Sequence, residues 1–356
     1  YEISCSLVGS EMCIRDSSKT EVTPVASNVN SEITFNVAPR TKALSQTQTD
    51  FDHNNVFVSY AYYLGPGKTW AANNSEAQMY IDGSTISYNG NLWKNETTSY
   101  YWPKDGGSLT FFAYSYNKKD MTVGDNSGFA CVWALGEDGQ YQGGITGHFD
   151  VATNKNVDFL VADIAADKTE NENNYAHTGV PTLFRHKLSM VNVAANLAED
   201  YANKKFILNS VKFTNLCHYA TYSQIPEKMI PGGNMFLSDQ VYAENVGFEV
   251  KSGGLIAVPA EIKKGAGVED GQYIYIPQEF NDDSYIVITY TVETVVGNKV
   301  VKEECTKPVK VKDVFPKWEM GHRYTFNLTF SLNEIHWDPA VENWIDDEAG
   351  NITIDR

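Results

Sequence analysis

The sequence has no apolar run long enough to form a membrane-spanning helix. Such a helix needs about 20 consecutive apolar residues, whereas the apolar residues here come in short runs. A sustained helical period is also missing, and only residues 194–201 are expected to form a short helix. The sequence therefore predicts neither a transmembrane helix nor a helical bundle.

Cysteine is scarce and lacks the spacing of a metal site. Cys5 and Cys13 lie within the first 17 residues, which are set aside below. Cys131, Cys217 and Cys305 remain, an odd number without any CxxC pair. Disulfide frameworks and zinc ribbons need paired, closely spaced cysteines, so neither is supported. No metal and no cofactor is expected.

Basic residues are outnumbered, with 28 lysines and arginines against 45 acidic residues and a formal net charge of -17. A surface this acidic repels phosphate backbones, so nucleic acid is not expected as a partner. The acidity suits a soluble, exported protein.

The first 17 residues do not resemble natural protein sequence. Residues 7–17 read Leu-Val-Gly-Ser-Glu-Met-Cys-Ile-Arg-Asp-Ser, which resembles a translated sequencing adapter. We therefore leave residues 1–17 out of the fold prediction as a non-native segment. They are expected to pack against nothing, and a natural amino terminus with its export signal would have been lost.

What is abundant is short alternation of apolar and polar residues, the signature of half-buried strands. Hairpin turns are marked by Asp82-Gly83, Asn89-Gly90 and Gly297-Asn298, since Asn-Gly and Asp-Gly tolerate positive φ. The predicted strands are residues 33–37, 56–63, 77–81, 84–88, 109–116, 158–162, 188–194, 206–213, 273–276, 285–292, 300–304 and 324–332. This pattern predicts an all-β fold.

A polar stretch between residues 163 and 181 interrupts the strands and suggests a domain boundary near Pro181. The chain length of 356 residues also favours two domains. We predict an N-terminal β-sandwich at 18–181 and a C-terminal β-sandwich at 182–356.

No catalytic motif emerges. Gly65-Pro66-Gly67-Lys68-Thr69 ends like a phosphate-binding loop, but Tyr62 stands where the motif needs a glycine. His186 and His322 are expected to satisfy hydrogen bonds at strand ends. Cys217 and His218 are adjacent, so on a strand they point to opposite faces and cannot easily share a metal.

Two acidic clusters could hold calcium, although solvated turns are the favoured interpretation. They are Asp282-Asp283 and Asp346-Asp347-Glu348. A glycosidase-type pair of carboxylates depends on spatial proximity, and nothing in the sequence points to one.

Aromatic residues give the one hint of a ligand. Trp70, Trp93 and Trp102 gather in the first half, next to Tyr100 and Tyr101. Exposed rings could bind sugars or protein surfaces, whereas buried rings would close the ends of a sandwich. Burial of all three tryptophans would remove the sugar-binding hypothesis.

Several segments in order extend over nearly the whole chain from Ile33 onward. They are Ile33-Thr34-Phe35-Asn36-Val37 with Arg40-Thr41, Tyr101-Trp102-Pro103 before residues 109–114, residues 158–162, Phe184-Arg185-His186-Lys187-Leu188-Ser189, residues 318–326 and Val341-Glu342-Asn343-Trp344. Together these segments resemble the fimbrillin (Mfa-like, type V pilin) family of Bacteroidetes.

The resemblance implies two transthyretin-like sandwiches, exported as a lipoprotein to the outer membrane. It also implies that a protease cuts after an arginine behind the first strand, which leaves and is replaced by a strand of the next subunit. Ile33, Phe35 and Val37 would be the inward residues of this removable strand, and Arg40 the cleavage residue. The alternative is that the strand stays in place. Residues 335–354 would donate the strand or form an edge strand of their own.

The sequence thus predicts a non-enzymatic structural or adhesive pilus subunit at the cell surface, with other pilin subunits as partners. A host or bacterial surface protein or glycan is a further partner to consider. The alternative is a monomeric glycan-binding lipoprotein. A hydrolase ranks last because no convergent acids or nucleophile–base pair is visible.

Overall fold

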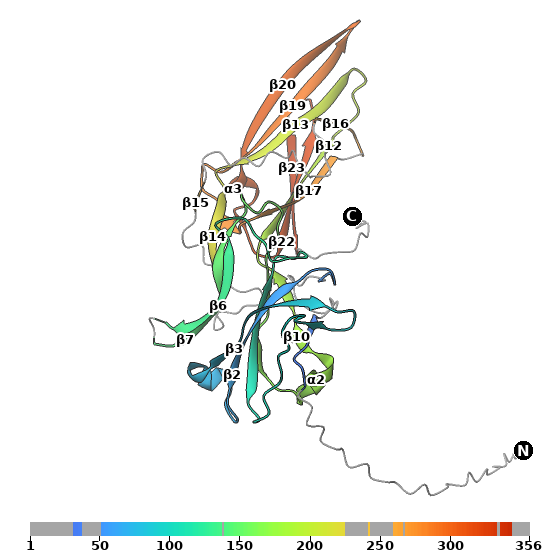
Figure 1. Cartoon of the computed structure of the whole chain (residues 1–356). Helices are drawn as coiled ribbons and strands as arrows, with labels where there is room; N and C mark the ends of the chain where they lie inside the picture. The colour runs from blue at the N-terminus through green and yellow to red at the C-terminus, as the bar shows by residue number, and fades with distance from the viewer. Residues whose placement is uncertain are drawn as a thin grey trace, which may run out of the picture. The chain divides into compact units, whose positions relative to one another are not determined.

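The fold comes from a computed structural model that describes residues 31–37, 51–136, 139–224, 241–242, 259–265, 268–332 and 335–343. Residues 1–17, Arg40 and the cluster at 346–348 lie outside the described residues. Strands make up most of the described chain (Figure 1), which confirms the all-β prediction.

The strands before residue 187 are short to medium in length. They are β1 (Phe35–Val37), β2 (Phe57–Leu64), β3 (Gln78–Tyr88), β4 (Trp93–Lys94), β5 (Ser108–Ser115), β6 (Gly128–Leu135), β7 (Tyr141–Asp150), β8 (Leu160–Ala162), β9 (Ala165–Lys168), β10 (Val180–Thr182) and β11 (Phe184–His186).

The later strands include two of twelve residues. They are β12 (Ser189–Leu197), β13 (Lys204–Thr214), β14 (Cys217–Ser223), β15 (Val241–Tyr242), β16 (Ala260–Ile262), β17 (Val268–Tyr275), β18 (Gln278–Glu279), β19 (Tyr285–Val296), β20 (Lys299–Lys310), β21 (Lys317–Trp318), β22 (His322–Phe330) and β23 (Ile335–Asn343).

The described helices are single turns. They are α1 (Trp70–Asn73), α2 (Tyr175–Thr178), α3 (Val311–Val314) and the 3-10 turns η1 (Asn74–Glu76) and η2 (Glu172–Asn174). Within the described ranges, none of these helices has the length and apolar character needed to cross a membrane.

The N-terminal sheet has the strand order β10-β1-β4-β3-β2-β5-β8-β11, with β9 also paired to β5. Its two end strands, β10 and β11, are separated in the chain by Leu183 alone. The two ends of the sheet therefore come together, and the sheet curls around an apolar core. That core includes Phe35, Phe57 and Phe111.

Strands β2 and β5 at the centre of this sheet are buried on both faces. Phe57 and Phe111 point into the core inside the curled sheet. Tyr62 and Phe112 point to a second core, which also receives Tyr222 of β14. Burial on both faces explains why these two strands are almost continuously apolar in sequence.

The C-terminal half forms a sandwich of two four-stranded sheets, in the orders β17-β12-β22-β23 and β16-β13-β19-β20. Alternate residues of β12, β13, β19 and β22 fill the core between them. The hairpin β19–β20 lies along β13 (Figure 1). Its outer strand β20 is mostly exposed and contains Pro308, which suits an edge strand because proline removes a hydrogen-bond donor.

A further sheet, ordered β15-β14-β7-β6, joins strands from both sides of the predicted boundary (Figure 1). In β7 a side chain at Gly143 would place its Cβ 1.9 Å from the Val132 carbonyl oxygen of β6, so the close approach of the two strands needs glycine. Strands β10 and β11 also continue the N-terminal sheet past Pro181. The division at residue 181 stays a prediction.

Two local predictions are wrong. Residues 194–201 form no helix, because β12 continues to Leu197 and its alternate residues Val193, Ala195 and Leu197 are buried. Asp82-Gly83 makes a register shift inside one strand, β3, rather than a hairpin turn. The turns at Asn89-Gly90 and Gly297-Asn298 are confirmed, since each joins two antiparallel neighbours.

Candidate functional site at the first strand

The first strand lies between two short neighbours in the curled sheet. Its residues Phe35 to Val37 pair in parallel with β10, and Phe35 pairs with Trp93 of β4 in antiparallel fashion. The Val180 amide donates to the Thr34 carbonyl oxygen at 2.7 Å. Removing β1 would therefore leave two strands with open backbone edges facing one slot.

The residues just before β1 make a second set of backbone bonds. The Ile33 amide donates to the Tyr100 carbonyl oxygen at 2.7 Å, and the Trp102 amide donates to the Ser31 carbonyl oxygen at 3.0 Å. The slot therefore has two parts, one along residues 100–102 and one along β10. A segment of about seven residues fills both.

The inward side chains of the segment complete the N-terminal core. Ile33 and Phe35 are only 3% and 2% exposed, and Val37 is half-buried against the same core. The Phe35 ring makes edge-to-face contacts with Phe57 and Phe111, at centroid distances of 5.5 and 5.7 Å. The sequence alternation predicted this inward set, and losing it would expose an apolar groove.

The backbone of β1 passes very close to Gly179, the residue before β10. A Cβ at Gly179 would lie 2.7 Å from the Phe35 carbonyl carbon, closer than real Cβ contacts come. Gly179 also has φ 79° and ψ 156°, a region essentially restricted to glycine. Glycine here keeps the slot wide enough for a strand.

The three tryptophans offer no exposed ring. Trp70, Trp93 and Trp102 are 6%, 3% and 2% exposed. Trp70 packs on Trp133 at 4.4 Å between ring centroids, and Trp93 packs on Phe51 at 5.2 Å. Their burial fits the core-packing interpretation and leaves none of the three rings free to stack on a sugar.

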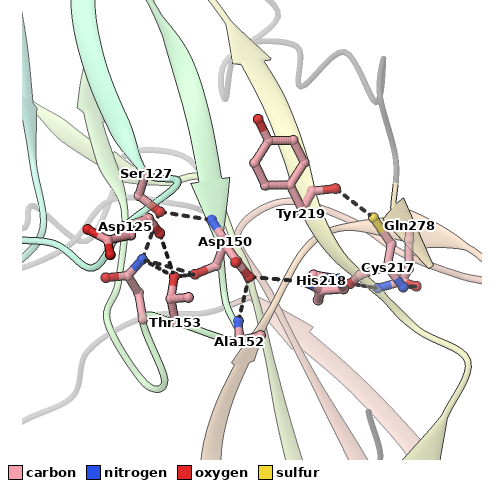
Figure 2. Close-up of polar contacts among 10 residues, drawn as sticks. Asp125, Ser127, Asp150, Ala152, Thr153, Cys217, His218, Tyr219 and Gln278 are labelled. Carbon is pink, nitrogen blue, oxygen red and sulfur yellow. Dashed lines mark hydrogen bonds and ion pairs between the residues drawn. The ribbon is translucent and has the colours of Figure 1, made fainter. Parts of the chain in front are cut away.

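The close-up in Figure 2 shows that the side chains of Cys217 and His218 make separate contacts. The Cys217 thiol is buried and contacts the Tyr219 carbonyl oxygen at 3.1 Å. The His218 Nδ1 instead contacts the Asp150 carboxylate at 2.9 Å. Among the residues that the structure describes, no three histidine, cysteine or acidic side chains gather where they could hold a metal.

Asp150 organises the connection between the β7 end and β14. Its side chain is buried and accepts a hydrogen bond from the Ala152 amide at 2.8 Å. Its backbone amide donates to the Ser127 hydroxyl at 3.0 Å. Each of these polar groups bonds to another group of the chain, so the network has a structural role.

The other polar candidates are also in structural contacts. His186 Nδ1 lies 2.8 Å from an Asp158 oxygen, and His322 Nδ1 lies 2.9 Å from the Met320 carbonyl oxygen. Both predictions of hydrogen bonding at strand ends are confirmed. Asp282 is paired with Lys310 and Lys312, which hold the pKa of its carboxyl below the usual range.

A buried charged cluster next to β11 was missed at the sequence level. Arg185 is 5% exposed and forms two bonds with the Asp163 carboxylate, at 2.7 and 2.6 Å. Lys187 is 3% exposed, and burial lowers its pKa to about 7. In the sequence, Arg185, His186 and Lys187 form a polar run that looks like an exposed segment. Only the tertiary structure shows that they are buried.

The model of the fimbrillin-like family matches residues 41–344. The chain belongs to the fimbrillin-like family. No curated protein matches the sequence. Membership confirms the resemblance noted in the sequence and supports a pilus-type, structural subunit at the cell surface, with other pilin subunits as partners.

The fold of this fimbrillin-like chain is similar to that of a solved fimbrial protein. A fimbrial protein from Bacteroides vulgatus has a TM-score of 0.56 and 19% identity, over 88% of this chain and 99% of that one. The tip fimbrial protein Mfa3 of Porphyromonas gingivalis has a TM-score of 0.36 and 9% identity, over 83% and 95%. The anchor protein Mfa2 of the same species has a TM-score of 0.33 and 11% identity, over 88% and 97%.

Proposed function

We propose that this chain is a subunit of a type V pilus that polymerises by β-strand exchange. Proteolysis after Arg40 releases the segment that contains β1, and a strand from another subunit takes its place. The observation that carries the proposal is the position of β1, a strand of three residues held in a slot between β10 and β4.

The geometry of the slot supports replacement rather than simple loss. The emptied slot offers backbone partners on both sides and pockets for Ile33 and Phe35. Backbone hydrogen bonds would supply affinity for an incoming strand, and its alternate side chains would supply specificity. An open, apolar groove is costly in water, which favours occupation by a second subunit.

The proposal includes an outer-membrane location through a lipid attached near the natural amino terminus, and no enzymatic activity. Family membership supports the location and the absence of activity. The absence of activity is also supported by the structural contacts of His186, His218 and His322. The carboxyl-terminal region from Ile335 is one source of the incoming strand. In this structure β23 is an edge strand paired with β22.

Limited digestion with an arginine-specific protease tests the proposal on a chain that starts at Ser18. Arg185 is buried within a strand and Arg323 lies within β22, so Arg40 is the preferred internal site. We expect cleavage at Arg40, followed by growth of polymers on incubation. An Arg40→Gln variant should stay uncut and monomeric. A cut chain that stays monomeric would overturn strand exchange.

A further inference from the structure

The segment that fills the slot is also held by one charged contact. An oxygen of the Glu32 carboxylate lies 3.2 Å from the Lys94 Nζ, and the Ser99 hydroxyl donates to its other oxygen at 2.8 Å. Glu32 itself pairs with Tyr101 across an isolated bridge. Both carboxylate oxygens are thus engaged at the end of the slot near residues 100–102.

The charged contact and the apolar pockets lie on different sides of the segment. Ile33 follows Glu32 directly and is buried, so in extended backbone the two side chains point to opposite faces. Lys94 likewise follows the buried Trp93 on β4. The side chains of Lys94 and Glu32 are 33% and 28% exposed, which places the contact at the rim of the groove.

The contact belongs to the part of the chain that strand exchange would remove. Glu32 lies before Arg40, so it would leave together with β1, whereas Lys94 and Ser99 belong to the part that stays. The departure would leave an ammonium group and a hydroxyl at the entrance of the groove, without the carboxylate that they hold now.

We propose that Lys94 and Ser99 form a recognition site for a carboxylate on the strand that fills the groove. The preferred occupant is an extended segment in which an acidic residue directly precedes the first buried apolar residue and an aromatic residue follows two positions later. This inference rests on the proposed strand exchange. The same spacing recurs in the sequence at Glu334-Ile335-His336-Trp337.

A carboxylate at this position selects a register as well as a partner. A slip of the incoming strand by one residue would turn its apolar side chains outward. It would also move the carboxylate to the face opposite Lys94. A slip by two residues keeps the apolar face but moves the carboxylate by about 6.6 Å, beyond contact with the ammonium group.

Peptide exchange into the full chain cut at Arg40 tests the site. The probes are a peptide of residues 31–37, the same peptide with Glu32→Gln, the same peptide with Phe35→Ala, and a peptide of residues 333–339. Each competes with a fluorescent copy of residues 31–37, and its affinity is measured at low and high salt. The protein is used unchanged and as Lys94→Met, Lys94→Arg and Lys104→Met.

We expect Glu32→Gln to weaken binding to the unchanged protein by about 1.5- to fivefold, the range of a solvent-accessible ion pair. High salt should shrink the difference, and Lys94→Met should abolish it, whereas Lys94→Arg should preserve most of it. Lys104 is a matched control, because its ammonium pairs with Glu170 elsewhere on the surface. Lys104→Met should leave the difference unchanged.

Other outcomes would overturn the proposal in distinguishable ways. If the Phe35→Ala peptide binds poorly but Glu32→Gln makes no difference, strand exchange stands and the carboxylate site does not. If Glu32→Gln weakens binding equally in Lys94→Met, the carboxylate acts elsewhere. If no peptide enters the groove, both the carboxylate site and strand exchange are wrong.

Discussion

Substitutions at Phe35 should reveal whether β1 comes away as a unit. The three changes are Phe35→Leu, Phe35→Ala and Phe35→Asp, which remove progressively more of the contacts with Phe57 and Phe111. In a rigid core, Phe→Ala costs about 3–5 kcal/mol and a buried unpaired charge costs several kcal/mol more. If β1 can leave its slot, the loss cannot exceed the free energy that docks the strand.

We therefore expect the loss of stability across this series to reach a plateau. Phe35→Leu should lower the free energy of unfolding by about 1–2 kcal/mol and Phe35→Ala by about 3 kcal/mol. Phe35→Asp should cost about the same as Phe35→Ala, since the strand leaves the slot instead of burying the charge. The matched control is Asn36→Ala, because Asn36 is exposed on the same strand and should change stability by less than about 0.5 kcal/mol.

Urea unfolding gives the free energies, and amide hydrogen exchange shows which segments open. With Phe35→Asp, the amides of Val180 and Trp102, which now bond to residues 31–34, should exchange quickly while those of β2 and β5 stay protected. Loss of protection throughout β2 and β5 would refute the reasoning, because the strand would then be inseparable from its domain.

Three further predictions concern the slot and the two buried polar clusters. Gly179→Ala should destabilise the intact chain by at least about 2 kcal/mol, because the backbone angles of Gly179 strain any other residue and the added Cβ would clash with the Phe35 backbone. The same change should slow peptide entry into the cut chain. Rapid entry would contradict a tight slot. Burial lowers the pKa of Lys187 to about 7 in the folded state, so between pH 7 and pH 10 the unfolded state binds more protons and the free energy of unfolding should rise with pH. In urea titrations, Lys187→Met should reduce this rise by at most about 1.4 kcal/mol per pH unit. An unchanged slope would assign the pH dependence to another group. Asp150→Ala should lower the free energy of unfolding by about 2 kcal/mol, because the Ala152 amide and His218 lose their acceptor; an unchanged urea midpoint would show that solvent replaces the carboxylate.

Much of the fold could be predicted because its strands alternate strictly. Residues 324–332 were predicted as a strand with one buried face, and β22 buries Tyr324, Phe326, Leu328 and Phe330. Residues 33–37 likewise indicated that Ile33 and Phe35 point inward, although Thr34 between them is also buried. Where the local pattern and the tertiary environment agree, as in β22, period-2 reasoning is reliable.

The errors and omissions come from long-range contacts. Residues 194–197 are rich in alanine and favour a helix locally, but pairing of β12 with β22 from Met190 to Leu197 overrides this preference. The pairing of β14 with β7 across the predicted boundary has no local signal. The contact of Glu32 with Lys94 joins residues far apart in sequence, so spacing rules could not find it.

The pairing of β1 with β10 also limits when the N-terminal sheet can finish folding. During synthesis β2, β3 and β5 are all available long before residues 180–182, and closing so long a loop is slow. The core inside the curled sheet must therefore wait, with Phe57 and Phe111 incompletely covered, until the segment after Gly179 emerges. A nascent chain that stalls before this point would be a target for chaperones, and refolding in vitro should show docking of β1 as its last kinetic phase.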